Sequence, residues 1–247
     1  MSCRAACGGR PDGRVGWRAA DGIALVAALM ALAFVAAIGL GLVLTVSLEP
    51  VAAANYESAW AARFGAEAAV FVAAHELAAT SAWDGALDGT VTSSRLTSPA
   101  ATVVLPDGTT ASTAALTNQA VCGHAEPCTR AETVAMTTDR PWGPNNPVWR
   151  AFGVLRLEPG HAAVPGGVPP VAVVVWVGDD PAELDGDPLH DTRPFADGSR
   201  GPGACAVCLR AEAFSARGGH RVMTALLARA GPTCSGPARL AVWRDLP

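Results

Sequence analysis

The sequence predicts an α+β fold in which a long N-terminal helix packs on an antiparallel β-sheet domain. Three observations predict it. The 27 residues 22–48 carry no charge and are almost all apolar. A helical pattern continues from there to about residue 80, and the chain after residue 100 contains short β-branched segments separated by turn residues. A helix with an apolar face and a set of short strands bury their apolar surfaces by packing on each other.

The apolar run is long enough to cross a membrane. A bilayer core needs about 20 apolar residues in a helix, and only Thr45 and Ser47 interrupt the run. A secretory signal peptide has a shorter apolar core, of about 7–15 residues, followed by a cleavage site, so we expect no cleavage after the run. Four arginines precede it: Arg4, Arg10, Arg14 and Arg18. Because positive charge stays on the cytoplasmic side, the N-terminus is predicted in the cytoplasm and the remaining chain outside.

The helix is predicted to continue as an amphipathic segment to about Thr80. Its large apolar side chains recur at spacings of four, four, seven and six, which places them along one stripe of an alanine-rich helix. They are Tyr56, Trp60, Phe64, Phe71 and Leu77. This stripe is the face that we expect to pack.

The rest of the chain is predicted to be rich in β-strands. Residues 101–105 and 109–111 flank Asp107-Gly108 and predict a hairpin, because aspartate-glycine favours a tight turn. A second hairpin is predicted where residues 205–214 and 221–228 flank a glycine-containing loop. Further strands are predicted at 149–157, 171–177 and 240–243, and loops at 81–100 and 158–170.

Three blocks near the N-terminus carry a family resemblance. They are Gly22-Ile23-Ala24-Leu25-Val26, Ser47-Leu48-Glu49-Pro50-Val51-Ala52-Ala53-Ala54-Asn55 and Gly65-Ala66-Glu67-Ala68-Ala69-Val70. The PilX-like minor pilins of type IV pili, which are related to the pseudopilins, have similar blocks: Gly-x-Ala-Leu-Val, Thr-Leu-Glu-x-x-Met-Ala-x-Asn and Ala-x-x-Ala-Glu-Ala-Ala-Leu. The chain resembles this family over residues 22–71. Segments 140–143, 173–181 and 242–244 also resemble the C-terminal parts of pilus-assembly proteins.

The resemblance implies a domain organisation and a processing site. Residues 1–22 would be a cytoplasmic leader, 23–48 the transmembrane and polymerisation helix, 49–80 its amphipathic extension, and 81–247 the exported β-rich domain of a pilin-like roll. A prepilin peptidase would cleave after Gly22 and leave Ile23 as the first mature residue. The family-motif positions on the helix are Leu48, Glu49, Asn55 and Glu67.

One departure from the family pattern bears on the place of the subunit. Major pilins have a glutamate at the fifth mature residue, where this chain has Ala27. The resemblance therefore implies a minor or tip subunit of a type IV pilus or related filament. Its expected partners are other pilin or pseudopilin subunits, prepilin peptidase, the inner-membrane assembly platform and the lipid bilayer. The expected location is the bacterial cytoplasmic membrane, crossed once, with the exported domain in a surface filament.

The cysteines allow two interpretations. Cys3 and Cys7 belong to the leader, and five cysteines follow: Cys122, Cys128, Cys205, Cys208 and Cys234. Disulfides are expected in an oxidising compartment, with Cys122 bonded to Cys128, and Cys234 to either Cys205 or Cys208. The alternative is a zinc site formed by Cys122, Cys128, Cys205 and Cys208, together with His124.

An acidic segment at residues 179–191 is the candidate site for a small ligand. It contains five aspartates around a glycine: Asp179, Asp180, Asp185, Asp187 and Asp191. Calcium takes six to eight oxygen ligands at about 2.3–2.6 Å, so these residues form a pool of candidate ligands and calcium is the candidate cofactor. Their spacing does not match an EF-hand, and a solvated acidic loop is the alternative.

The sequence contains no recognisable catalytic motif, and we expect a non-enzymatic protein. His75-Glu76 begins like a zinc-protease helix, but no second histidine follows four residues after His75. The arginines are scattered among acidic residues, which argues against a nucleic-acid partner. Two functions remain: a minor pilin or pseudopilin, and a signal-anchored exported module that binds a metal or another ligand and is unrelated to pili.

Overall fold

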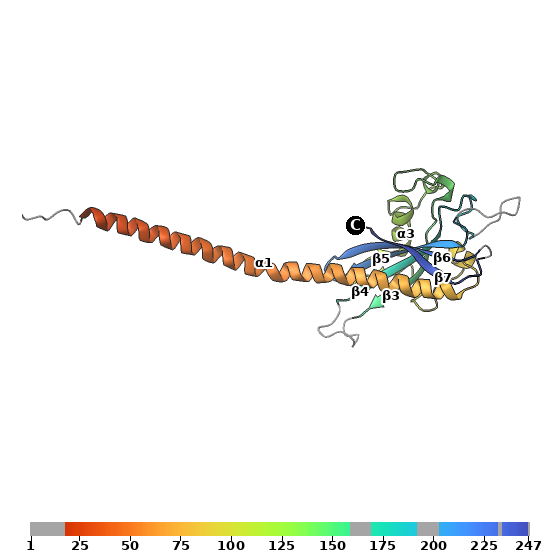
Figure 1. Cartoon of the computed structure of the whole chain (residues 1–247), viewed down its shortest axis with the longest axis horizontal. Coiled ribbons are helices and arrows are strands. Elements are labelled where there is room, and N and C mark those ends of the chain that lie inside the picture. The colour runs from red at the N-terminus through yellow and green to blue at the C-terminus, as the bar shows by residue number, and fades with distance from the viewer. Residues whose placement is uncertain (1–17, 159–168, 192–202, 232–233, 247) are drawn as a thin grey trace, which may run out of the picture. The chain divides into compact units, whose positions relative to one another are not determined.

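The computed structural model describes residues 18–158, 169–191, 203–231 and 234–246, and Figure 1 shows their helices and strands. The chain divides into two units, Met1–Ala52 and Ala53–Pro247. The first helix, α1 (Arg18–Ala79), belongs to both. The helix begins at Arg18, whereas it was expected to begin at Ile23. Its end at Ala79 confirms the predicted end near Thr80.

The second unit contains the remaining elements. After α1 come the short helix α2 (Asp84–Asp88), the strands β1 (Thr102–Val104) and β2 (Thr110–Ser112), and the helices α3 (Thr113–Cys122), α4 (Arg130–Thr133) and η1 (Gly143–Asn145). The strands β3 (Arg150–Leu157), β4 (Val171–Asp179), β5 (Ala206–Ser215), β6 (His220–Arg229) and β7 (Ala238–Leu246) follow.

The described strands β3 to β7 form one antiparallel sheet in the order in which they occur in the chain. This confirms an α+β fold, both predicted hairpins and the five predicted strands, with boundaries that differ by three residues or fewer at each end. The turn between β1 and β2 contains Gly108 with φ of 86°, a conformation that favours glycine. Segment 81–100 is not entirely loop, because it contains α2, and most of 158–170 lies outside the described residues.

Layers of side chains cover both faces of the sheet, as the burial of β4 demonstrates. All nine residues of this strand are buried. Alternate side chains point to opposite faces: Val171, Val173, Val175 and Val177 pack with the C-terminal part of α1, whereas Ala172, Val174 and Trp176 pack with β1 and α3. The indole Nε1 of Trp176 donates to Thr117 Oγ1 of α3 at 2.8 Å. Figure 1 shows α3 and the C-terminal part of α1 on either side of the sheet.

The packed face of α1 is made of small residues, and the prediction of an aromatic packed face was wrong. The side chains of Tyr56, Phe64 and Phe71 are exposed by 64%, 56% and 58%, and Leu77 is the one member of the predicted stripe that is buried. The buried face is instead formed by Ala62, Ala66, Ala69, Val70 and Ala73. A Cβ on Gly65 would lie 2.7 Å from Val171 Cγ1, so the helix backbone approaches the sheet too closely for aromatic side chains.

Contacts from β6 and from Trp83, the residue before α2, hold the C-terminal end of α1. The guanidinium of Arg229 donates to the carbonyl oxygens of Leu77, Thr80 and Ser81. It also lies 4.3 Å from the ring centroid of Trp83, whose indole Nε1 donates to Leu77 O at 2.9 Å. The last carbonyls of a helix have no partner within it. These donors reach the carbonyl of Leu77 in the last turn and those of Thr80 and Ser81, just beyond the end of the helix.

Candidate functional site

The candidate functional surface of the first unit is the apolar part of α1. Every side chain of residues 22–53 is exposed in the structure. The helix contains a segment long and apolar enough to cross a membrane. Exposed apolar surfaces of this size commonly mark sites of contact with a membrane or with another protein.

The expected cleavage point lies on this exposed helix. A Cβ placed on Gly22 would meet no atom within 4 Å, and the same is true of Gly39 and Gly41. Ile23 is 72% exposed. Substitution of Gly22 is therefore sterically free, which makes it a clean test of processing.

The family-motif positions fall into two environments. Leu48, Glu49 and Asn55 are exposed. Glu67 is half-buried, and its Oε1 lies 3.1 Å from Nε of Arg63. The same Arg63 nitrogen lies 3.8 Å from Asp245 of β7, so Glu67 belongs to a polar contact between the helix and the sheet.

A second polar contact between α1 and the sheet involves residues that sequence reasoning missed. Ser58 and Ser215 are buried, and their hydroxyl oxygens lie 2.5 Å apart. The Ser215 hydroxyl is also 2.9 Å from Ser58 O. A Cβ on Gly219 would lie 2.7 Å from that carbonyl oxygen. A serine within an alanine-rich helix is the signal that could have indicated a buried polar contact.

Part of the acidic segment forms a compact group at the end of β4. One carboxylate oxygen each of Asp179, Glu183 and Asp191 lie within 4.8 Å of one another. Asp179 and Glu183 are only 3% and 1% exposed. Glu183 was absent from the predicted ligand pool; its spacing of four from Asp179 in an acidic segment was the available signal.

The other predicted ligands lie outside this group. The Asp180 carboxylate accepts a hydrogen bond from Ala182 N at 3.1 Å. Asp185 Oδ1 accepts from Asp187 N at 2.9 Å, and Asp187 Oδ2 lies 3.1 Å from His190 Nδ1. Asp185 remains close enough for its charge to act on Asp179.

Burial and like charge both disfavour ionisation of Asp179. Burial is the larger cause and the charge of Glu183 the next, and together with Asp191 and Asp185 they raise the pKa of Asp179 to about 8. Burial also raises the pKa of Asp180. A cation bound beside Asp179 would lower the pKa of this carboxyl group again, because it favours the charged form.

The cysteines form the predicted disulfides. Cys122 is bonded to Cys128, and Cys205 to Cys234. The zinc interpretation was wrong, because these bonds use the sulfurs of three of its four cysteines. Cys208 is the free cysteine among the described residues, and burial raises the pKa of its thiol to about 12. At neutral pH this thiol is therefore held in its protonated form, which is a poor nucleophile.

His124, the fifth residue of that zinc interpretation, pairs with a carboxylate. Its Nε2 lies 3.2 Å from Glu132 Oε1. Glu132 also closes a capping box with Thr129 at the start of α4. Hydrogen bonds from Thr129, with a further contribution from His124, lower the pKa of Glu132 to about 2.

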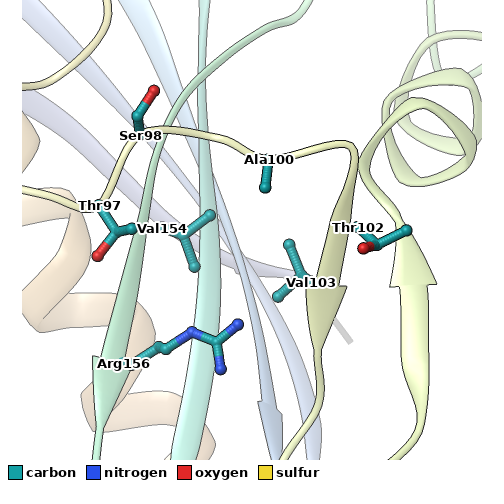
Figure 2. A pocket seen from close by; sticks show the side chains of 7 residues that line it. All are labelled: Thr97, Ser98, Ala100, Thr102, Val103, Val154 and Arg156. Carbon is teal, nitrogen blue, oxygen red and sulfur yellow. The ribbon is translucent and has the colours of Figure 1, made fainter.

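A small cavity of 40 Å³ lies between β1, β3 and the segment that precedes β1, and Figure 2 shows the side chains that line it. Val103 and Val154 line it from the two strands, and Arg156 lies at one end. Pockets that bind small molecules usually have volumes of roughly 300–1,000 Å³. This cavity has room for a few atoms only.

Comparison of the chain with models of protein families, with curated proteins and with solved structures found no match.

Proposed function

We propose that the protein is a non-enzymatic minor pilin or pseudopilin. A prepilin peptidase processes it after Gly22, and its apolar helix assembles into, or at the tip of, a type IV pilus or related filament. The observation that carries this proposal is that the two parts of α1 have different surroundings. Residues 22–53 present their side chains outward, whereas an alanine face between residues 62 and 73 packs on the sheet.

Such a helix suits a subunit that moves from a bilayer into a filament. The exposed side chains of residues 23–48 are packed by lipid in the membrane and by the helices of other subunits in the filament. The core of the second unit does not depend on this surface, because its clusters are formed by residues from Ala61 onward. The subunit could therefore exchange one apolar environment for another without unfolding its β-rich domain.

Ala27 supports a minor or tip position rather than the main filament subunit. In major pilins the carboxylate at this position is thought to pair with the N-terminal amine of a neighbouring subunit. A charge buried in lipid is acceptable only with such a partner. A chain without the carboxylate lacks this contact between subunits.

The experiment that tests the proposal is determination of the intact mass and N-terminal sequence of membrane-extracted protein, with and without prepilin peptidase. We expect a chain that starts at Ile23 only when the peptidase is present. The variant Gly22→Val should remain uncleaved, and Gly39→Val should be cleaved normally. Both glycines are exposed on the same helix, so a difference between the variants reflects recognition of the cleavage site. An uncleaved wild-type chain in the presence of the peptidase would overturn the proposal.

The second candidate function is a signal-anchored exported module that binds a metal or another ligand. The buried carboxylates of Asp179 and Glu183 favour it. This candidate expects the same N-terminus with and without the peptidase, and stability that depends on the ligand.

A further inference from the structure

Asp179, at the end of β4, has one carboxylate oxygen that accepts no hydrogen bond from the described residues. Oδ1 of Asp179 is shielded from solvent and has no hydrogen-bond partner among the described residues. The whole Asp179 side chain is 3% exposed. A buried polar group without a partner destabilises a fold. The orphaned oxygen and its position beside two further carboxylates are separate observations that indicate a positively charged ligand.

The backbone fixes the positions of the three carboxylates. Asp179 ends β4 and pairs with Val207 of β5. A turn in which Glu183 N donates to Asp180 O at 2.9 Å brings Glu183 back toward Asp179. Asp191 is held at both its backbone and its side chain: its N donates to Asp84 Oδ1 at 3.0 Å, and its Oδ1 accepts from Cys205 N at 2.9 Å. Glu183 and Asp191 also make further interactions of their own.

We propose that Asp179, Glu183 and Asp191 together bind one calcium ion. Two oxygens on the same calcium ion lie at most about 4.6–5.2 Å apart, since each is about 2.3–2.6 Å from it. The separation of these three oxygens, at most 4.8 Å, fits within that limit. Magnesium demands a near-ideal octahedron of ligands at about 2.0–2.1 Å, whereas calcium accepts irregular sets of carboxylates. The carboxylate of Asp185, whose Oδ2 also lacks a hydrogen-bond partner among the described residues, is a further acidic group close enough for its charge to act on Asp179.

The ion explains why acidic side chains gather at a buried position. Without a cation, ionised Asp179 and Glu183 would hold negative charge at positions shielded from water, and the three neighbouring carboxylates would repel one another. With calcium bound, the negative charges become ligands, and Asp179 Oδ1 gains the partner that it lacks. The site joins the end of β4 to the loop that contains Asp191, and that loop is joined through Cys205 to β5. Calcium is therefore expected to stabilise this edge of the β-rich domain.

The first measurement is terbium luminescence of the full-length protein in detergent after removal of metal with EDTA. Trp149 can sensitise the probe because its ring contacts the backbone beside the site: a Cβ on Gly178 would lie 3.0 Å from Trp149 Cε3. We expect terbium emission on excitation of tryptophan, and displacement of terbium by calcium at lower concentrations than by magnesium. Absence of emission in the wild-type protein, or emission that calcium does not displace, would overturn the proposal.

The second measurement is thermal unfolding of the same preparation with calcium and with EDTA. We expect calcium to raise the Tm of the wild-type protein. Asp179→Asn and Glu183→Gln should each weaken calcium binding by about tenfold or more, since ligand charge sets affinity in such sites. Asp139→Asn and Glu126→Gln are matched controls that remove the same charges from exposed positions, and both should keep the wild-type response.

Asp179→Asn also distinguishes two roles of Asp179, as a calcium ligand and as a residue that only stabilises the fold. In EDTA at pH 8 this variant should unfold at a higher temperature than the wild-type protein, because it loses like-charge repulsion. A variant that is less stable in EDTA and still binds calcium as the wild type does would overturn the proposal. If Asp179→Asn fails to fold, Glu183→Gln and the wild-type titration decide the question. The outcome does not depend on processing after Gly22.

Discussion

Arg229 is the residue that contributes most visibly to holding α1 on the sheet. It lies on β6 and donates to the carbonyl oxygens of Leu77, Thr80 and Ser81, while its guanidinium stacks on Trp83. A single side chain of β6 thus donates hydrogen bonds to carbonyl oxygens at the end of α1 and just beyond it. The residue is effective because guanidinium offers several donors in a rigid plane and also packs on aromatic rings.

Arg229→Ala is expected to destabilise the domain by about 1–3 kcal/mol, because it removes the donor to the partly buried Thr80 O and the guanidinium that packs on Trp83. The measurement is urea unfolding of the full-length protein in detergent, followed by tryptophan fluorescence. The exposed Arg239→Ala is the control for loss of one positive charge on a neighbouring strand. Equal unfolding midpoints for the two variants would show that Arg229 does not hold the helix end.

Glu132 contributes to the stability of the folded domain in a way that depends on pH. Its pKa is lowered from the ordinary value to about 2 by hydrogen bonds from Thr129 and by His124. A carboxyl group whose pKa is lower in the folded state stabilises the fold above its unfolded pKa, and this contribution disappears as pH falls through the folded pKa. The capping box of α4 should therefore weaken between about pH 4.5 and pH 2.

We expect the stability difference between the wild-type protein and Glu132→Gln to be constant near pH 6 and to shrink as pH falls through that window. The Glu132 side chain is 45% exposed, so solvent screening keeps the effect small. Urea unfolding at a series of pH values measures it, with Glu126→Gln as a control for an exposed acid close to the same histidine. A difference that stayed constant down to pH 2 would show that the lowered pKa does not arise from this capping box.

The elements meet where small side chains allow a close approach. On α1, alanines recur at positions 62, 66, 69 and 73, which is the spacing of one helix face. They pack on the valines of β4. The sequence analysis favoured the aromatic residues because large apolar side chains usually fill cores, but proximity of the backbones decided the packed face here.

Ala66→Leu should destabilise the domain by about 1–3 kcal/mol through overpacking. Ala68→Leu should have little effect, because Ala68 is exposed on the same helix. Both variants exchange alanine for leucine, another good helix former, so the difference between their unfolding midpoints measures packing alone. If the two variants were equally stable, the helix would not pack through this face.

At the scale of the whole molecule, patterns within one segment predicted its structure, and contacts between segments were harder to foresee. The β4 run of valines and the Asp107-Gly108 turn determine their own conformations, so strands and hairpins were placed within a few residues. Glu183 joins Asp179 and Asp191 only because a turn and a disulfide-linked loop converge at the end of β4. The spacing of Cys122 and Cys128 indicated their pairing, whereas the partner of Cys234 required the folded chain.

The number of thiols that react with a label tests two predictions at once: cleavage after Gly22 and formation of the two disulfides. The two disulfides and the partly buried Cys208 account for every cysteine after the leader. A chain cleaved after Gly22 loses Cys3 and Cys7, so we expect no rapid reaction with maleimide in the native state and one labelled thiol after unfolding without reductant. Uncleaved Gly22→Val keeps the leader and should carry up to two additional labels. Mass spectrometry of the labelled chains gives the counts and the positions. Three labelled thiols among Cys122, Cys128, Cys205, Cys208 and Cys234 in the cleaved chain would show that one of the two disulfides does not form.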